Sequence, residues 1–88
     1  MAGQKYILTD ENDYVVFTPM IEHSKMARVL RGNVVGAGFC HISSTTDEDG
    51  NLCPDVKCYG LSVSLNVESR EQDGSIISRE MVKWERGF

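Results

Sequence analysis

The predicted fold rests on the segment from Asn33 to Glu68, in which VVGAGFCHISSTT (34–46) precedes a polar connection and YGLSVSLNVE (59–68) follows it. In the second stretch, Tyr, Leu and Val alternate with Gly, Ser, Asn and Glu. A period of two is typical of a strand that buries one of its faces. The connection, residues 47–51, contains an Asp-Gly pair. We therefore predict two long antiparallel strands joined by a turn there.

Matching the buried faces of the two strands restricts their register. Opposed residue numbers must sum to an even value, because a slip of one residue turns every apolar side chain to the other face. The register that we favour places Phe39 opposite Tyr59 and Ala37 opposite Leu61. The Asp-Gly pair alone would favour a two-residue turn and an odd sum. Burial of one complete apolar face stabilises the hairpin more than the turn preference of the Asp-Gly pair, so we favour the even sum. An even sum requires an odd number of loop residues, and we therefore predict a loop of three or five residues.

The second face of this predicted hairpin carries unusually small side chains. It collects Gly36, Gly38, Cys40, Cys58, Gly60, Ser62 and Ser64. Small residues allow another backbone or an aromatic ring to approach closely. The ordinary explanation is that a helix of the same chain, or the single Trp84, covers this face. The alternative is a self-association surface or a ligand groove, and on that hypothesis these seven residues form the interaction site.

An N-terminal hairpin is predicted before this segment. Residues 5–9 and 14–18 are rich in β-forming side chains and flank a polar connection of four residues. If this connection closes tightly, Leu8 faces Val15.

Two helices complete the prediction. Thr18 and Pro19 suit the start of a helix over residues 20–31, since Thr caps well and Pro fits the first helical position. An alternative start at Ser24 would leave only two turns. A Ser-x-x-Gln capping box at residues 69–72 opens the second helix, which Gly87 is suited to end.

The order strand, strand, helix, strand, strand, helix predicts an α+β fold. We expect a mainly antiparallel sheet of about four strands with both helices packed on its apolar face. The 88 residues, 41% hydrophobic and 25% charged, suit one small globular domain over residues 1–88.

Charge and cysteine usage restrict the setting. A net charge of −4 argues against nucleic acid as a general partner, because such binding relies on neutralising phosphates. The one basic cluster, Lys25, Arg28 and Arg31, supplies the alternative hypothesis of phosphate contacts through the first helix. We expect no secretory signal and no membrane span. Three cysteines, an odd number, suggest reduced thiols and a cytoplasmic protein.

The residues that could carry chemistry do not converge in the sequence. Cys40 and His41 are adjacent on a predicted strand and therefore point to opposite faces, which argues against a zinc site with Cys53 and Cys58. His23 could approach a thiol, but no third group is evident to orient it. We therefore predict no catalytic residue, no metal and no cofactor. The expected function is a non-enzymatic interaction or accessory module whose partner is a protein, including another copy of itself; a small Cys/His enzyme is the least favoured alternative.

Overall fold

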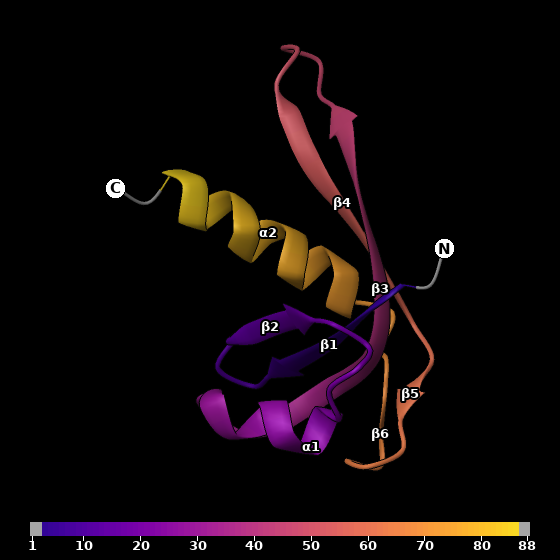
Figure 1. The fold of residues 1–88 in the computed structure, drawn as a ribbon. Helices are drawn as coiled ribbons and strands as arrows, with labels where there is room; N and C mark the ends of the chain where they lie inside the picture. Colours follow the sequence, from indigo (N-terminus) through magenta and orange to yellow (C-terminus); the bar gives the residue numbers. More distant parts are fainter. Residues whose placement is uncertain (1–2, 87–88) are drawn as a thin grey trace.

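The structure is a computed structural model that describes residues 3–86, with the side chains of residues 3–83 (Figure 1). Its elements are, in chain order, β1 (Gln4–Thr9), β2 (Tyr14–Phe17), α1 (His23–Met26), the 3-10 helix η1 (Ala27–Val29), β3 (Val34–Thr46), β4 (Leu52–Tyr59), β5 (Leu61–Ser62), β6 (Val67–Glu68) and α2 (Asp73–Arg86). Four strands form an antiparallel sheet in the order β2-β1-β3-β4, and β5 pairs with β6 in a separate ribbon. The predicted α+β class, the four-stranded antiparallel sheet and the two helices are confirmed.

The two helices cover opposite faces of the sheet, whereas the sequence analysis placed both on one face. On one face, Ile77 of α2 packs in a buried cluster with Tyr6, Leu8, Cys40 and Val56. On the other face, side chains from α1 and η1 pack against Ile7, Phe17 and Ala37. The reason lies in β1, where Tyr6, Ile7 and Leu8 are all 0% exposed. A continuous apolar run belongs to a strand that is buried on both sides, so each side needs its own cover.

The predicted register of the central hairpin is confirmed in its first half. Phe39 pairs with Tyr59, and the pairing continues to Thr46 and Leu52, which leaves a five-residue loop. The second predicted strand, however, stops at Tyr59. Gly60 adopts a left-handed φ of 76°, and its carbonyl accepts a hydrogen bond from the Ser69 N–H at 3.0 Å, so the chain leaves the sheet there.

The alternating run therefore does not form one strand, and the predicted pairing of Ala37 with Leu61 is wrong. Leu61 pairs instead with Glu68. Between β5 and β6 the chain turns over residues 63–66, and Asn66 has a left-handed φ of 55°. This small ribbon folds back over the sheet face that carries Ala37, where Leu65 and Val67 join the apolar cluster.

The N-terminal hairpin is shifted by one residue from its prediction. Val15 pairs with Ile7, and Leu8 pairs with Tyr14. The turn is the cause: the Thr9 N–H donates to the Asp13 carbonyl at 2.9 Å, and Asn12 takes a left-handed φ of 59°. A three-residue loop with a left-handed residue is a common hairpin connection and sets this register.

The first helix is shorter than predicted, and the second begins at Asp73, after the predicted capping box. Thr18 and Pro19 enter a turn that the Ile21 N–H closes on the Thr18 carbonyl at 3.2 Å, so α1 begins only at His23. The predicted capping box at residues 69–72 is replaced by Asp73, whose Oδ2 accepts the Arg70 N–H at 2.9 Å.

The distal part of the β3–β4 hairpin projects from the rest of the chain as a two-stranded arm, with α1 at the opposite end of the molecule (Figure 1). All residues from 41 to 52 are exposed. Within residues 3–86, no helix is long and apolar enough to cross a membrane.

Candidate functional site

The seven small residues singled out in the sequence do not share one open surface. Gly36, Gly38, Cys40 and Ser62 are buried, while Gly60 and Ser64 are exposed. A methyl group on Gly36 would overlap the carboxylate of Asp73, and one on Gly38 would lie 2.6 Å from the Tyr59 carbonyl oxygen.

The chain itself covers the buried members of this set: Asp73 of α2 lies against Gly36, and the Tyr59–Gly60 backbone lies against Gly38. Gly36 and Gly38 therefore fill close approaches inside the fold and are not open to a partner. Ser64 lines the pocket described below, and a partner contact through the remaining small residues stays a prediction. The Trp84 side chain, the other predicted cover, lies outside the described side chains.

A buried polar network holds α2 on this face. The Asp73 carboxylate is 0% exposed and accepts hydrogen bonds from the Tyr6 hydroxyl at 2.5 Å and from the Arg70 Nε at 2.8 Å, in addition to the Arg70 N–H. Burial, and then the hydrogen bond to Asp73, raise the pKa of Tyr6 well above its ordinary value. Tyr6 therefore stays a neutral donor to the carboxylate.

The thiols next to this network are poor nucleophiles. Cys40 and Cys58 oppose each other across β3 and β4, and both are free. Burial raises the pKa of Cys40 to about 11, and burial together with Cys40 raises that of Cys58 to about 12. Since the thiolate is the reactive form, both remain inert thiols at neutral pH.

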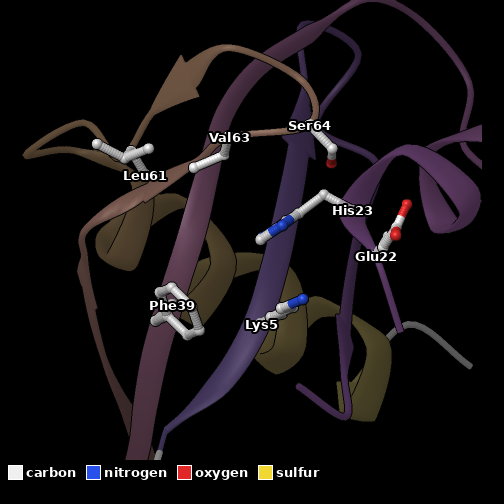
Figure 2. A pocket seen from close by; sticks show the side chains of 7 residues that line it. All are labelled: Lys5, Glu22, His23, Phe39, Leu61, Val63 and Ser64. Carbon is white, nitrogen blue, oxygen red and sulfur yellow. The ribbon is translucent and has the colours of Figure 1, made fainter. Parts of the chain in front are cut away.

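The candidate site lies on the opposite face of the sheet, next to α1. It is an open pocket of about 400 Å³ whose lining comes from four parts of the chain and comprises Lys5, Glu22, His23, Phe39, Leu61, Val63 and Ser64. Figure 2 shows the His23 ring directed into the middle of this group, with Leu61 and Val63 on one side of it. Most of the exposed lining is therefore carbon, which suits an apolar guest.

His23 forms a fixed floor for this pocket. It is 4% exposed, and its Nε2–H donates to the Gly38 carbonyl at 2.8 Å. Its ring meets Phe17 and Phe39 edge-on, with centroids 5.5 and 6.1 Å apart. Burial, with a smaller contribution from the charge of Lys5, lowers the pKa of His23. The imidazole is therefore neutral at physiological pH and is engaged in packing.

Two further contacts shape the rim of the pocket. The Lys5 Nζ donates to the Ile21 carbonyl at 2.9 Å, which ties β1 to the start of α1. The Ser24 N–H donates to the Ser64 Oγ at 3.2 Å, which ties α1 to the β5–β6 turn. The second contact joins two segments that are 40 residues apart in sequence. An ammonium group uses only one of its three hydrogens on Ile21, so Lys5 can donate to a guest as well.

Large apolar side chains continue the site onto the surface. Leu61 is 46% exposed, Val63 85% and Tyr59 48%. Tyr59 stacks on Phe39 with ring centroids 5.9 Å apart, which places an aromatic surface beside the pocket. Exposed apolar groups that adjoin a hollow are typical of binding surfaces.

The residues considered for metal or thiol chemistry are not brought together. Cys58 joins Cys40, but Cys53 pairs with Thr45 out on the arm and His41 points away from Cys40. Among residues 3–86, no group of three or more His, Cys, Asp or Glu side chains has the geometry to hold a metal ion. His23 in turn is engaged by a backbone carbonyl and by two aromatic rings.

The basic cluster is exposed but is spread over three local structures. Lys25 lies in α1, Arg28 in η1 and Arg31 beyond both. The Arg31 N–H donates to Asp13 Oδ2 at 2.9 Å, and Arg31 lines a polar pocket with Glu11 and Asp13. Acidic neighbours weaken the attraction of Arg31 for phosphate. Phosphate binding by this cluster stays a prediction.

Sequence reasoning missed the apolar wall of the site because it assigned Leu61 and Val63 to a buried strand. The sequence does contain a signal for the actual turns, since Gly60 and Asn66 bracket the run and both residue types tolerate left-handed backbone. Comparisons with protein-family models, curated proteins and solved structures found no match to this chain.

Proposed function

We propose that this chain is a non-enzymatic interaction module that holds an apolar side chain of a partner protein in the pocket beside α1. The observation that carries this proposal is the open pocket whose outer wall is Leu61 and Val63, with exposures of 46% and 85%. Its floor is immobilised by the contacts of His23, so little ordering is needed on binding.

The chemistry of the lining defines the guest. An aliphatic or aromatic anchor fits among Phe39, Leu61 and Val63, where it would remove carbon surface from water. Next to this anchor, a backbone carbonyl or a carboxylate of the partner can accept a hydrogen bond from Lys5. The expected partner segment thus combines one large apolar side chain with an adjacent oxygen acceptor.

The environments of Cys40, Cys58 and His23 support a role without catalysis. The thiols of Cys40 and Cys58 have raised pKa values, and His23 is committed to packing and to the Gly38 carbonyl. We place the module in the cytoplasm, a compartment that keeps thiols such as these reduced.

The test is selection of binding peptides from a random display library, followed by NMR mapping and titration. We expect the selected peptides to carry an apolar anchor, to shift the amides of Leu61 and Val63, and to bind at least about tenfold more weakly to Val63→Asp. Val29→Asp is the matched control, since Val29 is a 68% exposed aliphatic residue that is not among the pocket residues. Peptides that bind Val63→Asp and the parent chain equally well would contradict the proposal.

A further inference from the structure

The arm exposes one unpaired strand edge. The last pair between β1 and β3 is Gln4 with Cys40, whereas β3 continues to pair with β4 as far as Thr46. Among residues 3–86, no strand pairs with His41–Thr46 on the side away from β4. Figure 1 shows this part of β3 running out alone with β4. As far as the described residues extend, backbone groups in this stretch are consequently open to another strand.

The register identifies which backbone groups are open. The Asp47 N–H donates to the Asn51 carbonyl at 3.0 Å, so residues 47 and 51 form a hydrogen-bonded pair. Hydrogen-bonded pairs alternate along an antiparallel ladder, and the β3–β4 register is continuous from Phe39 to Thr46. The odd-numbered residues of the arm therefore bond to β4. Ile42, Ser44 and Thr46 direct their N–H and C=O groups to the open edge.

The outer edge of β4, in contrast, is protected. Pro54 has no N–H, and its carbonyl accepts the Ser78 hydroxyl at 2.7 Å. Gly74 of α2 packs directly on the Val56 carbonyl, where a methyl group would overlap it. The β3 edge has no lysine, proline or bulge between His41 and Thr46, and its side chains are mostly Ser and Thr. The usual defences against strand pairing are thus present on one edge and missing on the other.

We propose that two copies of this chain pair antiparallel along the open β3 edge, centred on Ser44. Opposed residues must lie on the same sheet face, so their numbers sum to an even value. When the numbers of opposed residues sum to 88, Ser44 lies opposite Ser44 of the second copy, and Ile42 lies opposite Thr46. This register pairs the open N–H and C=O groups of Ile42, Ser44 and Thr46 in about six backbone hydrogen bonds. Centring the pair on Ser43 would form only about four, because Thr46 would then meet Cys40, which is already paired with β1.

The association would stabilise the exposed arm, and the side chains at its ends favour the proposed register. A two-stranded ribbon with both faces in water is marginal, and pairing converts two arms into one four-stranded sheet. The same register places His41 opposite Asp47 of the second copy at each end. The Asp47 carboxylate is held in place by the Asp49 and Asn51 N–H groups at 2.9 and 2.8 Å. The His41 imidazole can thus donate a hydrogen bond to the Asp47 carboxylate across the contact, which favours this register.

Sedimentation equilibrium of the full chain from about 10 μM to 1 mM tests the proposal. We expect a monomer–dimer equilibrium. Ser44→Lys, which opposes two like charges at the centre, should raise the dissociation constant at least about tenfold. Ser43→Lys is the matched control and should dimerise like the parent, because its partner residue is Thr45. A monomer over the whole range would overturn the proposal, including the case in which the edge instead accepts an extended peptide of another protein.

A cross-linking experiment keeps the test independent of any effect of lysine on folding. In a Cys53→Ser background, Ser44→Cys should give a disulfide-linked dimer on mild oxidation, since directly opposed residues lie within disulfide reach. Ser43→Cys should not. Equal cross-linking of both variants, or a dimer unaffected by Ser44→Lys, would place the contact elsewhere and refute this edge. Val63→Asp should dimerise normally, which separates this contact from partner binding at the pocket.

Discussion

Replacing Asp73 with alanine should remove a large part of the free energy of unfolding of this chain. The carboxylate is fully buried and accepts hydrogen bonds from the Tyr6 hydroxyl, the Arg70 Nε and the Arg70 N–H. Alanine would leave the Tyr6 donor and the Arg70 charge without their partner in a region that water does not reach freely. An unpartnered buried group costs more than the paired interaction contributed.

The magnitude follows from these contacts. Breaking a buried ion pair by removing one member costs about 3–5 kcal/mol. Arg70 is 33% exposed and regains some hydration, which favours the lower end of that range for Asp73→Ala, about 3 kcal/mol. A domain of 88 residues has a total stability of about 4–13 kcal/mol. The variant should therefore lose a quarter or more of its stability.

Urea unfolding followed by circular dichroism measures the loss. With a slope of about 2 kcal/mol per M, the midpoint should fall by about 1.5 M. Glu71→Ala is the control, because it removes an exposed carboxylate two residues away and should change stability by less than about 0.5 kcal/mol. Tyr6→Phe, which removes one donor, should cost about 1–2 kcal/mol. If Asp73→Ala unfolds at the midpoint of Glu71→Ala, the network does not hold α2 on the sheet.

Three further outcomes are expected. Ellman's reagent should react quickly at pH 8 with Cys53 and slowly with Cys40 and Cys58, because the pKa values of these two thiols are raised to about 11 and 12. Three equally fast thiols would contradict the raised pKa values. The pKa of His23 is lowered in the folded chain, whereas in the unfolded chain it has its ordinary value of about 6.5. Below about pH 6.5 the unfolded chain therefore binds more protons than the folded chain. The free energy of unfolding should be highest above about pH 6.5 and should decline as the pH falls through the folded-state pKa. Urea midpoints at pH 7.5 and 5.5 measure this decline, and His23→Gln should reduce it. Gly38→Ala should lower the free energy of unfolding by at least about 2 kcal/mol, measured by thermal or urea unfolding. The φ of Gly38 is 154°, and the Tyr59 carbonyl oxygen would lie 2.6 Å from the new methyl group. A loss of under about 0.5 kcal/mol would show that the strand can shift.

The pocket shows where reasoning from the sequence reached its limit. The alternating pattern predicts extended structure at Leu61, which β5 confirms. It also predicts one continuous strand through Gly60, which is wrong because the chain turns there. A glycine inside an alternating run is compatible both with a strand that packs closely and with a left-handed turn. The choice depends on what the departing chain can bury, and here the β5–β6 ribbon gains contact with the face that carries Ala37. That gain joins Leu65 and Val67 to Ala37, which lies 28 and 30 positions earlier in the chain, and no local pattern reports such a contact.

Side-chain parity and the position of the polar turn were sufficient to predict Phe39 opposite Tyr59, because alternation along a strand is a covalent property of the backbone. The order of the strand and helix patterns was sufficient to predict the α+β class. The tertiary structure alone decided that the helices take opposite faces, that Asp73 occupies the space left by Gly36, and that Leu61 and Val63 stay in water beside His23. These outcomes depend on contacts between segments that lie far apart in the sequence. The free energy of such contacts cannot be assigned to the local pattern of any one segment.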